Sequence, residues 1–196
     1  MSAPRIPEHA IDPVFVSRWS PRIYDSSAMP LSDLLRLLEA ARWAPSAYNI
    51  QPWRFLYSLR GDAHWLGFLD LLNPSNASWA KHSSALVVLA SDTIMPGDDN
   101  RPQSSSRTHS FDAGAAWAQF ALQAASLGYQ AHAMAGIDFA RSRQYLAVPE
   151  QYRVEIAIAV GRCEKEQPLP AGNPANAGLS QRRPIEDFAA AGPFRA

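Results

Sequence analysis

Hydrophobic residues change their spacing along the chain, and each spacing predicts an element. Over 31–43, leucines and alanines recur every three to four residues, which is typical of an amphipathic helix. Ser32 is the expected N-cap of this helix, and Pro45 disfavours helical backbone at Ala44 and so ends it. The Ala-rich stretch over 111–127 predicts a long, buried helix closed by Gly128. Shorter helices are expected over 64–72 and 140–146.

Four runs of apolar and β-branched residues predict strands. They are WRFLYSL at 53–59, a compact apolar run at 86–91, YQAHAM at 129–134 and the alternating VEIAIAV at 154–160. Helices and strands therefore follow one another along the chain. This order fits either an α+β sheet flanked by helices or a doubly wound α/β fold.

Three segments lack a hydrophobic pattern. We expect an N-terminal arm over 1–13, a surface loop over 93–108 and an extended C-terminal arm over 163–196, which is rich in Pro, Gly and Asn. No internal repeat or second core is apparent. The sequence thus predicts one domain spanning 1–196.

The composition narrows the functional classes. Of the 196 residues, 47% are hydrophobic and 18% are charged, and the net charge is zero, so no chain-wide attraction to nucleic acid or to an anionic membrane is expected. The single Cys163 excludes an intrachain disulfide and a multi-cysteine metal site. The first residues lack a signal-peptide core, and the longest apolar run, ALVVLA, is too short to span a membrane. We expect a cytoplasmic protein.

A polar loop interrupts the pattern at ARWAPSAYNIQPWRF, residues 41–55, between a predicted helix and a predicted strand. Ser46, Asn49 and Gln51 offer donors and acceptors, and the prolines around them restrict the backbone. Such a loop could hydrogen-bond the polar edge of a flat heterocycle. Alternatively, it is a turn whose side chains satisfy its own backbone.

Two pairs of arginines suggest an anion site. Arg18 and Arg22 flank Ser20 in RWSPR, and Arg182 is followed by a second arginine. A guanidinium fork matches phosphate geometry, and a serine hydroxyl can add a donor. The alternative is a solvated basic face with salt bridges to Asp25 or Glu186.

Several other chemistries lack their signatures. The five histidines show no metal-ligand spacing, so we expect no metal. Neither GxGxxG after the first strand nor a P-loop is present, and no GxSxG surrounds Ser46. A dinucleotide-binding Rossmann site, a P-loop and an acyl-enzyme nucleophile are therefore not supported.

The order RxSxR, amphipathic helix, APSxxNxQPW resembles the nitroreductase family of FMN-dependent oxidoreductases. FDAGAAWAQFALQAASLGYQAHAMAGID, YRVEIAIAVGR and RRPIEDF resemble later segments of that family, so the likeness covers most of 14–188. The resemblance implies an α+β fold with a central, mainly antiparallel four-stranded sheet flanked by helices. It also implies a C-terminal arm that extends onto a dimer partner.

The resemblance further implies an FMN site shared by two subunits. The polar loop of one subunit would touch the flavin, and the RWSPR segment of the other would hold phosphate and ribityl chain together with Arg182. The Ala135 and Gly136 backbone would face flavin N5, and Asn76 with Trp79 would lie near the pyrimidine edge. Because the flavin carries the redox chemistry, no catalytic side chain is expected. The cofactor-binding residues implied are Arg18, Trp19, Ser20, Arg22, Pro45, Ser46, Ala47, Asn49, Gln51, Asn76, Trp79, Ala135, Gly136 and Arg182.

The implied reaction takes electrons from NADH or NADPH and passes them to a small electron-poor acceptor, such as a nitroaromatic or a quinone, by a ping-pong mechanism. The implied assembly is a homodimer. Alternatives are a monomer with a loose tail, a flavin carrier or sensor without turnover, or a specialised relative acting on another substrate. The chain departs from the family in its short 93–108 loop, in Ala135, where some members are acidic, and in Ser180 or Gln181, where a basic residue is frequent.

Overall fold

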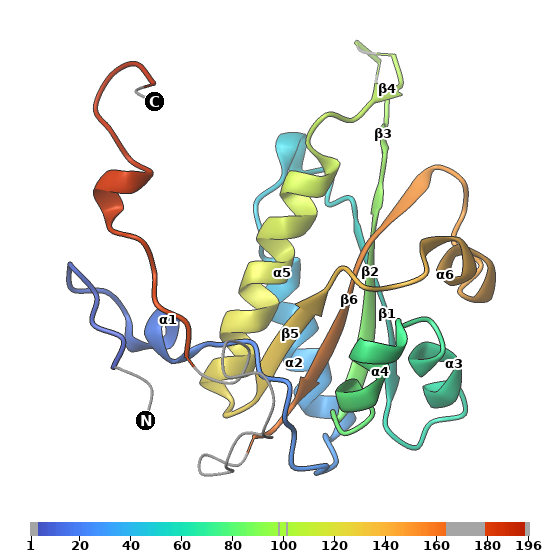
Figure 1. Cartoon of the computed structure of the whole chain (residues 1–196). Helices are drawn as coiled ribbons and strands as arrows, with labels where there is room; N and C mark the ends of the chain where they lie inside the picture. Colours follow the sequence, from blue (N-terminus) through green and yellow to red (C-terminus); the bar gives the residue numbers. More distant parts are fainter. Residues whose placement is uncertain (1–3, 98, 101, 164–178, 195–196) are drawn as a thin grey trace.

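The fold is built on a four-stranded sheet, seen in a computed structural model that describes residues 4–97, 99–100, 102–163 and 179–194 (Figure 1). The strands are β1 (Trp53–Leu59), β2 (Ala85–Asp92), β5 (Gln130–Met134) and β6 (Tyr152–Gly161), in the order β1-β2-β6-β5. Every neighbouring pair is antiparallel. The α+β prediction is therefore confirmed, and the doubly wound alternative is wrong because it requires parallel strands.

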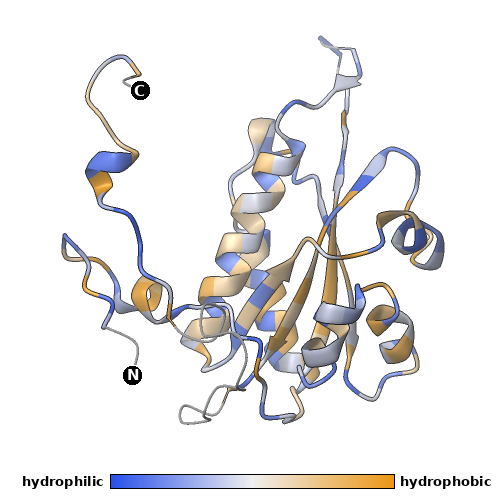
Figure 2. Ribbon diagram, in the orientation of Figure 1, coloured by the Kyte–Doolittle hydropathy of each residue, from blue (hydrophilic) through white to orange (hydrophobic). Residues whose placement is uncertain are grey.

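Helices cover both faces of this sheet (Figure 1). On one face lie α2 (Leu31–Arg42) and α5 (His109–Ser126), which pack on each other; on the other lie α3 (Trp65–Leu69), α4 (Pro74–Ala80) and α6 (Phe139–Tyr145). The sheet therefore has a hydrophobic core on each side, and its central strands are the most apolar part of the molecule (Figure 2). Along β2, Val87 faces the α2–α5 core and Val88 the other, as the alternation of a strand requires.

Most predicted elements are present, with shifts at their ends. Helix α2 begins at Leu31, and the residue before it, Pro30, makes no side-chain cap, so Ser32 is not the N-cap. Gly128 follows the C-cap of α5 with φ of +77°, a conformation that favours glycine. Helix α4 was not predicted: Asn73 caps it by accepting a hydrogen bond from the Asn76 N–H at 2.8 Å.

The peripheral segments carry short elements. Helix α1 (Pro13–Ser17) follows the N-terminal arm, with Asp12 as its N-cap. The segment expected to be an irregular loop over 93–108 contains two paired strands, β3 (Ile94–Met95) and β4 (Ser104–Ser105), which are too short to leave a pattern in the sequence.

Residues 179–194 contain a 3₁₀ turn, η3 (Ile185–Asp187), and run beside the N-terminal arm of the same chain (Figure 1). The expected reach of the C-terminal arm onto a partner stays a prediction, and part of that arm, 164–178, lies outside the described residues. No helix within the described residues has the length and apolar character that a membrane crossing would need.

Candidate functional site

The polar loop between α2 and β1 is tightly turned and strained. Tyr48, Asn49 and Gln51 all have φ between +50° and +56°, a region that side-chain-bearing residues rarely adopt. Backbone strain of this kind costs roughly 1–3 kcal/mol per residue and concentrates at functional sites. Tyr48 stands at the tip of the loop with 75% of its surface exposed.

The side chains of this loop divide into two roles. Ser46 Oγ accepts a hydrogen bond from the Gln51 N–H at 3.0 Å, and Gln51 Nε2 donates to the Asn49 carbonyl at 3.0 Å. These two side chains therefore satisfy the turn itself. The exposed side-chain amide of Asn49, in contrast, has no hydrogen bond with any residue that the structure describes. The turn interpretation is therefore confirmed for Ser46 and Gln51, whereas contact of Asn49 with a flat heterocycle stays a prediction.

A buried carboxylate anchors the loop to the body of the protein. Asp112, in the first turn of α5, is 3% exposed and accepts hydrogen bonds from the Ala47 N–H at 3.2 Å and the Thr108 hydroxyl at 3.1 Å. Asp112 was not among the residues predicted for the site. A lone acidic residue in an Ala-rich, buried helix was the available signal, because such a residue needs a partner.

A second group of candidate residues gathers at the turn after β5. The Gly136 carbonyl accepts hydrogen bonds from the Asn73 N–H at 3.0 Å and from Asn76 Nδ2 at 3.1 Å. A Cβ at Gly136 would lie 2.3 Å from Asn73 Nδ2 and 2.5 Å from Asn76 Nδ2, so any side chain here would force both amides to move. No described residue accepts a hydrogen bond from the Gly136 N–H. Beside it, Ala135 is exposed.

Trp79 lies next to this turn with an unused donor. Its indole packs between the rings of Tyr24, at 6.3 Å, and His132, at 4.8 Å. The indole N–H is buried and has no partner among the described residues. A buried donor of this kind is costly unless a ligand or water accepts from it, so the site is suited to a ligand acceptor.

His132, one of the five histidines without metal-ligand spacing, joins this group. The Nδ1 atom of His132 lies 2.8 Å from the Pro21 carbonyl oxygen, so Nδ1 carries a proton and donates it there. Burial lowers the pKa of His132; the hydrogen bond to Pro21 opposes this, and the charges of Arg22 and Arg18 add to it. A neutral imidazole is therefore favoured beneath the Trp79 ring.

Three arginines converge, and none of them forms an ion pair with a carboxylate of the described residues. Arg18 Nη1 donates to Ser20 Oγ at 3.4 Å, and Arg182 Nη1 donates to Ser180 Oγ at 2.9 Å. Burial, followed by the nearby Arg182 charge, lowers the pKa of Arg5 and of Arg18. Within the described part of the chain, none of the three forms an ion pair, so the salt bridges to Asp25 or Glu186 expected for a plain basic face are absent there.

A hydrogen bond and a cavity adjoin the three arginines. The Trp19 N–H donates to Gln130 Oε1 at 2.9 Å, which ties the RWSPR segment to the start of β5. A cavity of about 510 Å³ lies between the N-terminal arm and residues 181–188, and Arg5, Arg182, Phe15 and Phe188 are among the residues that line it. The cavity has room for a phosphate-sized anion next to the arginines and for an apolar group next to the aromatic side chains.

The polar loop and the RWSPR segment thus lie at opposite ends of α5 (Figure 1). The polar loop is held at the first turn of the helix through Asp112, whereas the RWSPR segment is held through Gln130, just past its last turn. One chain therefore does not bring Asn49 to Arg18.

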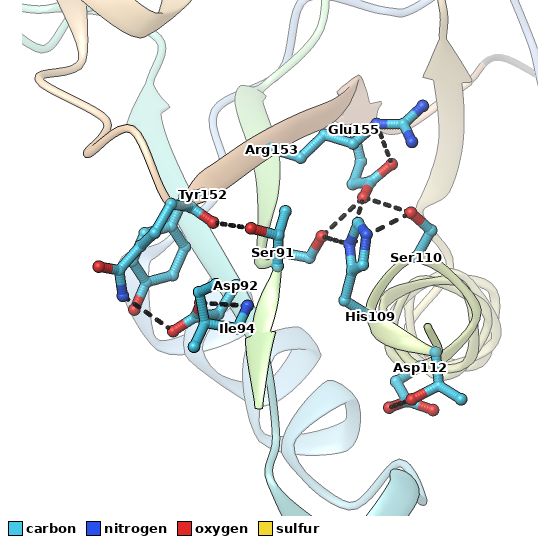
Figure 3. A network of polar contacts seen from close by, with 12 residues as sticks. Ser91, Asp92, Ile94, His109, Ser110, Asp112, Tyr152, Arg153 and Glu155 are labelled. Carbon is cyan, nitrogen blue, oxygen red and sulfur yellow. Dashed lines mark hydrogen bonds and ion pairs between the residues drawn. The ribbon is translucent and has the colours of Figure 1, made fainter. Parts of the chain in front are cut away.

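A further polar network surrounds the start of α5 (Figure 3). Ser91 and Ser110 both donate to Glu155 Oε1, at 2.6 and 2.7 Å, and His109 Nδ1 lies 2.8 Å from Ser91 Oγ. Because each hydroxyl has a single proton, and both point at Glu155, Nδ1 must be the donor to Ser91.

Glu155 occupies a special position in this network. The register passes from Leu89 opposite Ile156 to Ala90 opposite Val154, so Glu155 is the extra residue of a β-bulge. Bulges re-aim side chains, and this one directs a carboxylate to the helix end that carries Asp112. The network thus braces the helix turn that holds the polar loop.

The turn after β5 and the three arginines fit the cofactor that the sequence resemblance implies. FMN offers ring nitrogen and carbonyl acceptors, a hydroxylated chain and a phosphate. The unused Gly136 and Trp79 N–H groups match acceptor atoms, and the uncompensated arginines match the phosphate. Among the described residues, no group of three or more His, Cys, Asp or Glu side chains could hold a metal ion.

Comparison with known proteins agrees with this geometry. The model of the Nitroreductase family matches residues 16–64 and 70–162. A protein of Mycolicibacterium smegmatis, described as an uncharacterized 15.4 kDa protein in the ask 5′ region, is 34% identical over 116 residues, or 55% of this chain and 74% of that protein.

Solved structures extend the likeness to the whole chain. An oxidoreductase containing FMN is 41% identical, with a TM-score of 0.92 over 100% of this chain and 98% of its own. An FMN-dependent nitroreductase from Clostridium difficile has a TM-score of 0.65 at 21% identity, covering 89% of this chain and 95% of its own, and shares the fold.

Proposed function

Because the chain belongs to the nitroreductase family, we propose that it is an FMN-dependent oxidoreductase. It takes electrons from NADH or NADPH and passes them to a small electron-poor acceptor, such as a nitroaromatic or a quinone. The two substrates use one pocket in turn, in a ping-pong mechanism. The proposed unit is a single domain over 1–196, and the lone Cys163 fits a cytoplasmic setting.

The observation that carries this proposal is the convergence of Arg5, Arg18 and Arg182 without an acidic partner among the described residues. Like charges held together destabilise the fold unless an anion compensates them. A phosphate does so through charge-assisted hydrogen bonds, which are about twice as strong as neutral ones. The 41% identical oxidoreductase containing FMN supports FMN as the source of that phosphate.

Each group of residues has a defined task in this proposal. Arg18, Ser20 and Arg182 bind the phosphate and the adjoining chain. Asn76 and the Trp79 N–H donate toward the pyrimidine edge, and the free Gly136 N–H donates to ring N5. Bound FMN would supply the redox chemistry, accepting two electrons from the nicotinamide and passing them on. The protein supplies binding, orientation and exclusion of water.

A second copy of the chain completes the site. Asn49 and the other residues of the polar loop lie at the far end of α5 from Arg18, so a homodimer in which α5 helices cross would bring one copy's loop to the other's arginines. The exposed aromatics at this end support such an interface: Phe111, Tyr48 and Trp43 are 81%, 75% and 71% exposed. The C-terminal arm would add to the interface.

The test is the absorbance spectrum of the purified protein, after incubation with FMN and removal of the excess, followed by anaerobic titration with NADH and then NADPH. Flavin absorbance near ~450 nm that bleaches with a nicotinamide and returns with a quinone or nitroaromatic supports the proposed oxidoreductase. Absorbance that persists would favour a flavin carrier or sensor. If no flavin is retained, FMN-dependent catalysis is excluded.

A further inference from the structure

Arg5, in the N-terminal arm, joins segments that are distant in the sequence. Its Nη1 donates to the carbonyls of Val16 at 2.9 Å and Arg18 at 2.8 Å. Its Nε donates to the Ser180 carbonyl at 2.9 Å, and Nη2 contacts Ser180 Oγ at 3.4 Å. One guanidinium thus ties the end of α1 to residue 180.

The atoms that Arg5 contacts belong to the residues that present the other two arginines. Arg18 is the C-cap of α1, and its carbonyl is one of the acceptors. Ser180 precedes Arg182 by two residues, and its hydroxyl also accepts from Arg182 Nη1 at 2.9 Å. The Arg5 fork therefore sets the spacing between the Arg18 and Arg182 side chains.

We propose that Arg5 is a positioning residue of the anion site, which holds the Arg18 and Arg182 side chains at the separation that a terminal phosphate monoester requires. This inference rests on the proposed FMN function. A guanidinium has five N–H donors, and four of those of Arg5 are directed at protein atoms. Arg5 acts through its neighbours, and its charge adds to the field at the site.

The fork shape distinguishes this role from that of a plain positive charge. A lysine has a single nitrogen at the end of a flexible chain, so it cannot donate to the carbonyls of Val16, Arg18 and Ser180 in this fixed arrangement. Arg5→Lys keeps the charge and removes the geometry. Arg5→Ala removes both.

The experiment measures dissociation constants of FMN and of riboflavin for the full chain, by quenching of flavin fluorescence. Riboflavin lacks only the phosphate. The variants are Arg5→Ala, Arg5→Lys and Arg18→Ala, with Arg36→Ala as control. Arg36 is exposed on α2, and within the described part of the chain its one ion pair is with Asp33 at 3.5 Å. Unfolding by denaturant is measured for each apoprotein.

We expect Arg5→Ala and Arg5→Lys to weaken FMN binding about tenfold or more, as Arg18→Ala does, while riboflavin binding changes less than about twofold. Arg36→Ala should bind both as the wild type does. Equal losses for FMN and riboflavin would reveal a general structural role and overturn the inference. So would an Arg5→Lys protein that binds FMN like the wild type, because charge alone would then suffice.

The two proposals fail in different ways. If the wild type binds FMN and both Arg5 variants bind it equally well, the positioning role is wrong and the proposed function stands. If the wild type binds neither flavin, the proposed function is wrong, and the positioning role of Arg5 is then wrong as well.

Discussion

Asp112 Oδ2 accepts a hydrogen bond from the backbone N–H of Ala47 at 3.2 Å, so the first turn of α5 holds the strained loop in place. Asp112→Ala removes this acceptor and the one that the Thr108 hydroxyl uses. Loss of hydrogen bonds to a buried charged group typically costs about 1.5–3 kcal/mol of unfolding free energy. Denaturant unfolding should show a loss of this size, with Asp99→Ala as the exposed control. An unchanged midpoint would mean that Asp112 does not anchor the loop.

The two roles assigned to the polar loop can be separated by substitution. Ser46→Ala removes the acceptor of the Gln51 N–H and should lower the unfolding free energy by about 1 kcal/mol. Asn49→Gly keeps the positive φ and removes only the amide, so stability should change by less than about 0.5 kcal/mol. If the amide contacts flavin, the absorbance of bound FMN shifts in Asn49→Gly. A large loss of stability without a spectral change would show that Asn49 serves the turn alone.

Gly136 and Gly114 offer a matched pair. A methyl at Gly136 meets the amides of Asn73 and Asn76, whereas one at Gly114 meets no atom within 4 Å. Gly136→Ala should disturb the Asn73 cap, cost about 1 kcal/mol and weaken FMN binding. Gly114→Ala, in a helix, should raise stability by about 0.5–1 kcal/mol. Unfolding curves and FMN titrations of both variants measure these effects. An FMN affinity that Gly136→Ala leaves unchanged would mean that this turn does not contact FMN.

His132 should make stability depend on pH. Its pKa in the folded protein is lowered from 6.5, first by burial, so on acidification the unfolded chain takes up the proton more readily. The free energy of unfolding is therefore highest above pH 6.5, where His132 is neutral in both states. It decreases as the pH falls from 6.5 through the lower pKa of His132 in the folded protein. His132→Asn keeps a donor for the Pro21 carbonyl but does not titrate, so its unfolding free energy should vary less over this range. The check is an NMR titration of the folded wild type. A His132 pKa of 6.5 or above would contradict this account.

Glu155 should be important for stability. Glu155→Ala leaves the buried Ser91 hydroxyl and the Ser110 hydroxyl without their acceptor, at a cost of about 2–3 kcal/mol. Glu150→Ala, in an exposed turn, is the control and should be neutral. Thermal unfolding measures both. Equal melting temperatures for the two variants would mean that the network does not brace α5.

Much of the fold could be read from the sequence because hydrophobic spacing is local. The strand β1, the helix α2 and the long helix α5 were all predicted close to their observed bounds. Helix α4 was missed because its signal is a cap, Asn73 with Pro74, rather than an apolar stripe. The hydrophobic pattern left strand direction undecided, because alternation within a strand carries no information on its neighbour; the antiparallel sheet was implied by the family resemblance alone.

The site was predictable only where motif residues adjoin one another. The loop residues and the RWSPR arginines were identified in this way, but their separation along α5 depends on tertiary structure. The β-bulge at Glu155 and the start of α5 bring Ser91, His109 and Glu155 together, although Ser91 and Glu155 are 64 residues apart in the sequence. Arg5 was missed because its acceptors are backbone carbonyls, which every sequence has.

The contact between Arg5 and Ser180 joins residues 175 positions apart, near the two ends of the chain. Ring closure over so many residues carries a large entropic cost, so contacts of this kind form after local structure. During synthesis from the N-terminus, the sheet and both of its helical layers emerge from the ribosome before Ser180 does. The three-arginine cluster is therefore expected to form after the core, and a chain that ends before Ser180 lacks the residues that complete the anion site.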